Sequence, residues 1–170
     1  MSVDLRQLFD DLVRFETDLW NGVDARLRQA GAVSLGSLEV LRVVGRTPAC
    51  RVNDIADALS ITIGGASQAV DRLAARELCA RRPNPGDRRS SIVELTPAGA
   101  EALATAQAVF DADLLVWFGP AAPGSALRNL ARTLSTLRTA GVARRRAPGQ
   151  SKPDAKSTPE AQSKPGGDHA

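Results

Sequence analysis

The sequence predicts a mainly α-helical protein with one small β-hairpin. Up to residue 141, most apolar side chains recur at spacings of three and four, which is the period of an amphipathic helix. Between residues 78 and 95 this period gives way to two short runs that a proline- and glycine-rich segment separates. A hydrophobic fraction of 43% in 170 residues is enough for one packed domain with a tail.

Two helices are expected at the start of the chain, over about residues 4–30 and 34–45. Gly31 is a natural stop for the first, and Ser34 a natural cap for the second. The first helix carries an apolar stripe opposite a charged face. That stripe consists of Leu5, Leu8, Phe9, Leu12, Phe15, Leu19, Val23 and Leu27.

Residues 52–76 have the spacing of a helix-turn-helix. We expect a short helix begun by Asn53 or Asp54, then a tight turn that points Ile61 into the core. Thr62 is a natural cap for the longer second helix. This short-helix, turn, longer-helix arrangement is typical of proteins that place their second helix in the DNA major groove.

A β-hairpin follows, with strands expected at 78–82 and 91–95. Prolines and Pro-Gly between them stop both helix and sheet pairing, so residues 83–89 form an exposed tip. Arg88 and Arg89 sit at this tip. Charged side chains at such a position require solvent or a partner.

Two more helices and a tail complete the chain. Thr96 and Pro97 begin a long helix that ends near Gly119, and Ser125 begins the last one. Residues 142–170 are rich in proline, glycine, serine and lysine, so we expect them to be disordered. The last helix carries a leucine seam with coiled-coil-like spacing. Its members are Leu127, Leu130, Leu134 and Leu137.

The net charge of +3 hides an uneven distribution. Residues 142–170 carry +3, residues 1–41 carry −3, residues 42–94 carry +3 and residues 95–141 are neutral. The basic segment therefore coincides with the helix-turn-helix and the hairpin. A polyanion such as DNA is the partner that this segment favours.

Several classes of function lack the residues they need. The single histidine is His169, so histidine catalysis or a histidine metal site within the fold is not expected. Cys50 and Cys79 are too few for a zinc knuckle or a disulfide framework. No phosphate-binding Gly-Lys-Ser/Thr or dinucleotide motif occurs, which argues against an enzyme and against a cofactor. With no membrane-length apolar run and no leader-like N-terminus, we expect a cytoplasmic protein without a membrane partner.

Two stretches carry a resemblance to a known family. They are VNDIADALSITIGGASQAVDRLAARELCARR (52–82) and PGDRRSSIVELTPAG (85–99). With their flanking helices they resemble the MarR family of transcriptional regulators, which are winged helix-turn-helix dimers. The resemblance implies a DNA-binding lobe over 34–96 and dimerisation helices over 1–30 and 98–141. The tail, 142–170, lies outside it.

The second helix of the motif supplies most of the candidate DNA contacts. Its two glycines let the DNA approach the backbone, and its hydroxyls can donate to phosphates. A glutamine can read an adenine edge, and an arginine one turn later can reach a phosphate or a guanine. A merely solvated helix face is the alternative. The candidates are Thr62, Gly64, Gly65, Ser67, Gln68 and Arg72.

The resemblance also implies roles for the hairpin, which would be the wing. Arg89 would enter the minor groove, with Asp87 orienting it. Arg81, Arg82 and Arg88 would contact phosphates. A surface loop kept soluble by its charge is the alternative.

Dimerisation and an effector are further expectations. All six aromatic residues lie in the two segments 1–30 and 98–141, here called the arms, which favours association through the arms. A dimer in turn implies a palindromic operator. We expect a repressor that a lipophilic or phenolic effector relieves. An effector-independent architectural DNA-binding protein and a winged-helix protein-interaction module stay as alternatives. The predicted pocket, for which ordinary core packing is the alternative, comprises Phe15, Trp20, Leu38, Leu41 and Phe110.

Overall fold

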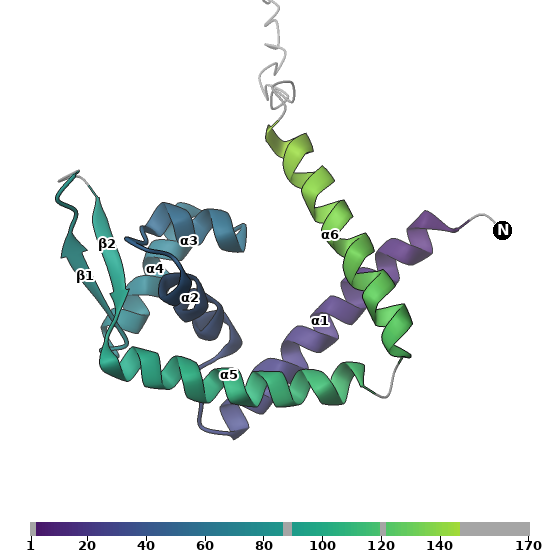
Figure 1. Ribbon diagram of the computed structural model, residues 1–170, viewed down its shortest axis with the longest axis horizontal. Helices are drawn as coiled ribbons and strands as arrows, with labels where there is room; N and C mark the ends of the chain where they lie inside the picture. The colour runs from purple at the N-terminus through teal and green to yellow at the C-terminus, as the bar shows by residue number, and fades with distance from the viewer. Residues whose placement is uncertain (1–2, 87–89, 120–121, 147–170) are drawn as a thin grey trace, which may run out of the picture. The chain divides into compact units, whose positions relative to one another are not determined.

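The computed structural model describes residues 3–86, 90–119 and 122–146, with side chains up to residue 141 (Figure 1). It confirms a mainly helical fold with one two-stranded antiparallel hairpin. The chain divides into two units, residues 1–123 and 124–170, which are described separately. The elements are α1 (Leu5–Gln29), α2 (Leu35–Arg46), α3 (Val52–Leu59), α4 (Ile63–Ala74), β1 (Cys79–Pro83), β2 (Ser91–Leu95), α5 (Pro97–Phe118) and α6 (Gly124–Arg146).

Local side-chain caps set the ends of α1 and α2. Asp4 accepts hydrogen bonds from the first-turn amides of α1, and Gly31 takes a left-handed φ of +70° just beyond its end. Ser34 caps α2 as predicted. Asp24 of α1 adds a second cap, because its Oδ1 accepts from the Leu35 amide at 2.8 Å. This bond joins α1 to the start of α2 and of the lobe over residues 34–96.

The start of α3 differs from the sequence expectation. The helix begins at Val52 with Arg51 as its N-cap residue, rather than at Asn53 or Asp54. Asp54 instead reaches back, and its Oδ2 accepts from the Arg51 amide at 2.8 Å. An acidic residue at the third helical position is half of a capping box, so Asp54 lies inside the helix it stabilises.

The turn between α3 and α4 closes through its backbone. Ser60 is left-handed at φ 56°, and the Ile61 amide donates to the Ala56 carbonyl at 3.1 Å. Ile61 is 44% exposed, so the prediction that it points into the core is wrong. Backbone hydrogen bonding, rather than burial of this side chain, ends α3.

The hairpin pairs Cys79 with Leu95 and Pro83 with Ser91, within one residue of the expected strands. Thr96 then joins three elements. Its hydroxyl accepts from the Gly99 amide at 2.9 Å, which caps α5, and donates to the Glu77 carbonyl beyond α4 at 2.6 Å. The wing and α5 are thereby fastened to the end of α4.

The core lies under α2–α4 and the hairpin and is built from aliphatic side chains. Leu27, Leu38, Leu41, Ile55 and Leu73 are its largest fully buried members. α5 packs against α1, α2 and β2 along its length.

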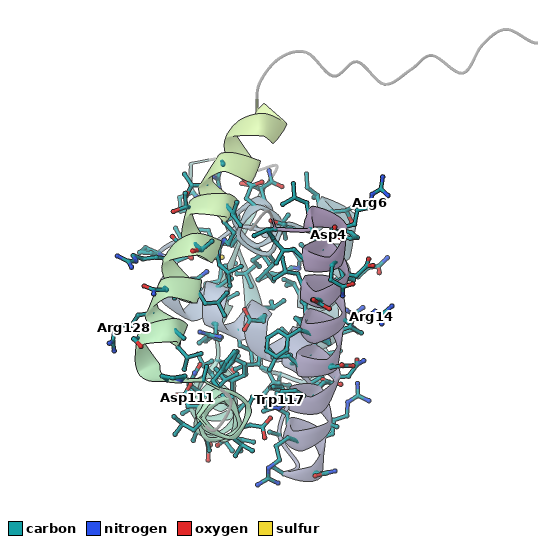
Figure 2. The ribbon with its side chains drawn as sticks, turned by 90° about the vertical axis from the view of Figure 1, so that its right-hand side faces the viewer. Asp4, Arg6, Arg14, Asp111, Trp117 and Arg128 are labelled. Carbon is teal, nitrogen blue, oxygen red and sulfur yellow. The ribbon has the colours of Figure 1, made fainter. Side chains whose placement is uncertain are left out.

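Aromatic residues pack where α1 meets the end of α5. The ring of Trp117 covers Gly22, where an added Cβ would overlap it. Phe15 packs edge-on against Trp117 and Phe118, with ring centroids 6.4 and 5.8 Å apart. On α1, Arg6 and Arg14 project outward (Figure 2).

α6 forms the described part of the second unit. It runs to Arg146, past the predicted boundary at residue 141, so the expectation that residues 142–146 are disordered is wrong. Alanine and arginine are good helix formers. Residues 147–170, the rest of the predicted tail, lie outside the described residues.

Candidate nucleic-acid interface

The outward face of α4 is the centre of the candidate interface. Ala66, Val70 and Leu73 bury the inner face of this helix in the lobe. Thr62 caps its N-terminus as predicted, with its Oγ1 accepting from the Gly65 amide at 3.1 Å. The cap holds the first turn in helical geometry and leaves the opposite face to solvent.

The two glycines near this end have different surroundings. A Cβ on Gly65 would stand 3.1 Å from the capping Thr62 oxygen. Close packing within the chain therefore explains why a glycine occupies this position. A Cβ on Gly64 would meet nothing within 4 Å. Glycine weakens a helix by roughly 1 kcal/mol relative to alanine. Packing within the described chain therefore does not explain Gly64.

Sequence reasoning missed Ile63. It is the first residue of α4 and is 58% exposed, beside the equally outward Gly64. An apolar side chain in the major groove contacts thymine methyl groups. Its three-residue spacing from Ala66 suggests an inward position, but the side chain at this first helical position is exposed.

Gln68 and Arg72 are exposed on the same face, one turn apart. In the part of the chain that the structure describes, neither side chain forms a hydrogen bond or an ion pair. Both are thus free to bind a partner. Ser67 differs, because its hydroxyl accepts a hydrogen bond from Arg81 at 3.2 Å.

The two arginines of β1 lie on opposite faces of the hairpin. Arg81 faces α4 and forms an ion pair with Asp71 at 2.8 Å. Arg82 faces away and pairs with Glu94 of β2 at 2.6 Å. Their predicted phosphate contacts stay predictions, but both guanidinium groups have partners in the free protein.

The tip of the wing is only partly described. Asn84 organises its base, since its side chain donates to the Ser90 hydroxyl at 2.9 Å and accepts from the Gly86 amide at 3.0 Å. Asp87, Arg88 and Arg89 lie outside the described residues.

A small apolar cavity lies between α1, α2 and α5. Its volume is about 190 Å³, and Trp20 and Phe110 of the predicted pocket line it. Arg42 lies over the Phe110 ring at 5.2 Å and pairs with Glu39. The full lining is Glu16, Leu19, Trp20, Val23, Leu35, Glu39, Phe110 and Leu114.

The other predicted pocket residues lie elsewhere. Leu38 and Leu41 are fully buried in the core of the lobe. Phe15 packs against the aromatic rings at the end of α5. These three side chains do not line the cavity.

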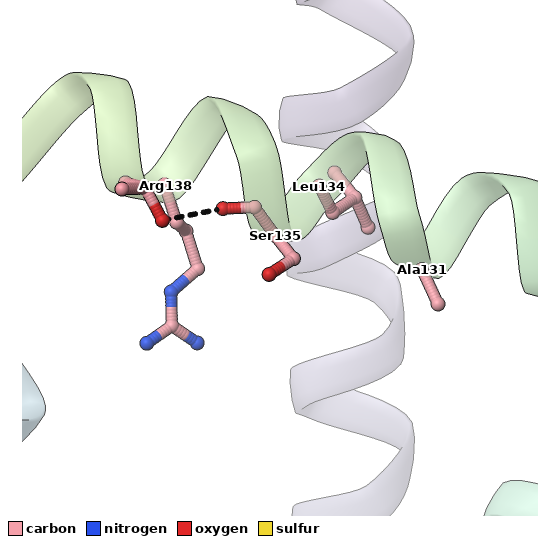
Figure 3. Close-up of a pocket in the computed structure, with 5 residues that line it drawn as sticks. Ala131, Leu134, Ser135 and Arg138 are labelled. Carbon is pink, nitrogen blue, oxygen red and sulfur yellow. Dashed lines mark hydrogen bonds between the residues drawn. The ribbon is translucent and has the colours of Figure 1, made fainter.

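A second hollow runs along α6 and involves residues of that helix alone. Figure 3 shows Ala131, Leu134, Ser135 and Arg138 beside it. The Ser135 carbonyl accepts from the Thr139 hydroxyl at 3.0 Å. A furrow on one helix encloses nothing, so it does not define a ligand site.

The two thiols are buried in the lobe. Burial raises the pKa of Cys79 to about 11, and the neighbouring Cys50 thiol adds to this rise. Burial, with the nearby Asp54 carboxylate, also raises the pKa of Cys50. Protonated, buried thiols are poor nucleophiles. Among the described residues, no histidine, cysteine and carboxylate group is suited to hold a metal ion, and no helix is long and apolar enough to cross a membrane.

Comparison with known proteins agrees with this arrangement. Residues 33–91 match the sequence model of the MarR family, which confirms the resemblance. No curated protein sequence matches the chain. Among solved structures, AbsC of Streptomyces coelicolor, a MarR family transcriptional regulator, is similar with a TM-score of 0.74 at 18% identity, covering 84% of this chain and 98% of its own.

Two other similar structures contain ligands. A cysteine-to-serine mutant of MarR from E. coli, complexed with operator DNA, has a TM-score of 0.70 at 20% identity, covering 77% of this chain and 93% of its own. CouR from Rhodococcus jostii RHA1, bound to p-coumaroyl-CoA, has a TM-score of 0.65 at 23% identity, covering 74% and 87%. These identities establish a shared fold.

Proposed function

We propose that this chain is a sequence-specific DNA-binding transcriptional regulator of the MarR type. The observation that carries this proposal is the outward face of α4, where Gln68 and Arg72 are exposed and have no partner among the described residues, and where Gly64 borders open space. α4 enters the major groove, and Gln68 reads a base edge there. Thr62, Gly65 and Ser67 lie next to the DNA backbone, where the two hydroxyls and the amides at the helix end bind phosphate.

The wing completes the interface in this proposal. Arg89 enters the adjacent minor groove, oriented by Asp87, while Arg88 binds a phosphate. The operator bound to MarR in a similar structure supports duplex DNA as the partner class. Basic residues concentrated over 42–94 supply the sequence-independent part of the affinity.

A dimer is part of the same proposal. Leu5 and Phe9 of α1 are 73% and 65% exposed, and Leu115 of α5 is 74% exposed. Large apolar side chains left exposed on both helices indicate surface that a second copy covers. A two-fold dimer presents two α4 helices about 34 Å apart, so it binds a palindromic operator.

The DNA-binding proposal is tested with a duplex that the full-length chain selects from a randomised pool. Arg72→Ala and Gln68→Ala should each weaken binding about tenfold, equivalent to the roughly 1–3 kcal/mol of one good base or charged contact. Arg76→Ala is the matched control, because Arg76 lies beyond the C-terminal end of α4. Fluorescence anisotropy measures the affinities. Equal affinities for all three variants would contradict the proposed role of this face.

We also propose that the protein is a repressor and that a small-molecule effector relieves the repression. The apolar cavity at Trp20 and Phe110 supports an aromatic or lipophilic effector, as does the p-coumaroyl-CoA bound by CouR. A ligand that favours one conformation of the dimer would release the operator.

The size of the cavity favours the alternative, an architectural protein without an effector. About 190 Å³ is smaller than the roughly 300–1,000 Å³ of ordinary ligand sites. A thermal-shift series with aromatic acids and phenols separates the two, provided that each hit is then tested for operator release. Hits that release DNA support the effector, and none in the series supports the architectural protein.

A further inference from the structure

Arg81 connects three elements of the DNA-binding lobe through one side chain. Its Nε and Nη2 donate to Oδ1 of Asp71 on α4 at 3.2 and 2.8 Å. Nη2 also donates to the Ser67 hydroxyl at 3.2 Å, and Nη1 donates to the Ser91 hydroxyl of β2 at 3.1 Å. The guanidinium group thus joins two positions of α4, four residues apart, to both strands of the hairpin.

Arg82 provides an internal comparison within the same strand. It pairs with Glu94, so its ion pair stays within the hairpin. Its side chain is 69% exposed, whereas that of Arg81 is 31% exposed. The two neighbours have the same chemistry, but only Arg81 connects the hairpin to α4.

The Arg81–Asp71 pair contributes more to orientation than to stability. Asp71 is 62% exposed, and solvent-exposed ion pairs contribute about 0–1 kcal/mol at most. A guanidinium group, however, is a rigid planar fork, and several acceptors fix its direction. A fork held at Asp71, Ser67 and Ser91 fixes the angle between α4 and the hairpin.

The ion pair also neutralises the negative charge of Asp71. Asp71 lies on the exposed side of α4, one residue before Arg72. An uncompensated carboxylate here would oppose the approach of DNA phosphates. Arg81 neutralises it, and the pair as a whole carries no net charge toward the DNA.

We propose that Arg81 is a positioning residue that sets the angle between the recognition helix and the wing, rather than a ligand of a DNA phosphate. This inference rests on the proposed DNA-binding function. Helix and wing read different grooves, so both can engage only at a fixed angle. Arg81 therefore acts on discrimination between sequences, while a phosphate ligand acts on all sequences alike.

The test compares Arg81→Gln with Arg82→Gln in the full-length chain. Affinity is measured by anisotropy over a range of salt concentrations, for the selected duplex and for an unrelated duplex of the same length. Arg81→Gln should lower the ratio of the two affinities about tenfold, as expected for loss of one specific contact region. The slope of log affinity against log salt on the unrelated duplex should not change. Arg82→Gln should leave the affinity ratio as it is.

Substitution of Asp71, the partner of Arg81, tests the proposal independently. Asp71→Ala should also lower the affinity ratio, and it frees Arg81 to bind phosphate. The salt slope on the unrelated duplex should then steepen by about 0.9, the value for one phosphate contact. Adding Arg81→Gln to Asp71→Ala should lower the ratio little further, because the two residues act as one unit. The Asp71→Ala measurement remains informative if circular dichroism shows that Arg81→Gln does not fold.

The outcomes that overturn the proposal are specific. If Arg81→Gln weakens both duplexes equally and reduces the slope by about 0.9, Arg81 is a phosphate ligand. Additive effects of the two substitutions on the affinity ratio would likewise overturn it. If the unaltered chain shows no salt-dependent affinity for any duplex, the DNA-binding function itself fails, which is a distinct result.

Discussion

The lobe and the arms use the same kind of apolar residue in opposite ways. In α2–β2, Leu38, Leu41 and Val70 have no exposed surface. In the first half of α1, Leu5 and Phe9 keep 73% and 65% of theirs. Both regions have amphipathic helices, yet only the lobe covers its apolar face with its own chain.

This difference teaches that helical periodicity predicts an apolar face but not what covers it. The lobe has three short helices and a hairpin around one centre, so each face meets another. In α1, the half with Val23 and Leu27 packs on the lobe, and the first half extends beyond it. The lobe buries its apolar faces within the chain, while the first half of α1 leaves its apolar side chains exposed. Four predictions examine this contrast.

The largest effect is expected where the lobe is tightest. A Cβ on Gly99 would overlap the Leu78 carbonyl, so Gly99→Ala should cost about 3 kcal/mol in unfolding free energy through overpacking. Urea denaturation followed by circular dichroism measures it. Gly36→Ala is the control, because a Cβ there meets nothing and helix propensity should make it neutral or stabilising. Equal stability of the two variants would show that the lobe tolerates repacking.

A charge on the arm should act on association instead. Phe9→Glu should weaken self-association about tenfold or more, since it places a charge in the exposed apolar stripe of α1. Sedimentation across a dilution series measures the change. The lobe does not use this side chain, so helical content should persist. Arg6→Glu, on the outward side of α1, is the control.

Because of the buried thiols, we expect the unfolding free energy of the lobe to depend on pH. The sequence has no tyrosine, and every lysine lies at or after residue 152. Among the described residues, the alkaline titration that should affect stability is therefore that of Cys50 and Cys79, whose pKa values burial raises above 9.0.

Their raised pKa values fix the sign. Between the ordinary thiol pKa of 9.0 and about 11, folded Cys79 keeps a proton that the unfolded chain has lost. Unfolding free energy should stay level below pH 9 and fall by on the order of 2 kcal/mol as the pH approaches 11. Thermal melts over this range measure the fall. Cys50→Ala with Cys79→Ala should flatten it, and a fall that persisted in this variant would assign it to another group.

The smallest effect concerns the end of α4. Glu77 adopts a left-handed φ of 57°, and the following Leu78 amide donates to the Leu73 carbonyl at 2.9 Å. Glycine takes this helix-end conformation without strain, so Glu77→Gly should stabilise the lobe by about 0.5–1 kcal/mol. Gly31→Ala, at φ +70°, should have the opposite sign. A destabilised Glu77→Gly would show that the glutamate side chain contributes more than its backbone strain costs.

Local signals predicted most of the fold. Ser34, Thr62 and Thr96 cap the helices that they were expected to cap, because capping depends on hydrogen bonds over three residues. Pro83 and Ser91 bound the hairpin tip for the same local reason. The miss at Ile61 is tertiary, since burial depends on how the turn enters the core.

The candidate site was predicted less completely. Gln68 and Arg72 were identified from their spacing on the second helix of the motif, and both are exposed there. Ile63 was missed, because its outward direction depends on how α4 begins. Three of the expected pocket residues fell elsewhere, since lining a cavity depends on how three helices cross.

The sequence alone determined the helices, the hairpin, the caps at Ser34, Thr62 and Thr96, and the concentration of basic residues over 42–94. These properties depend on neighbours along the chain. Only the tertiary structure decided that Arg81 faces α4 while Arg82 pairs within the hairpin. Alternation along a strand separates the two side chains, but which face meets a helix depends on how the sheet packs. Long-range packing brings Asp71 to Arg81 across ten residues, and no local pattern encodes that contact.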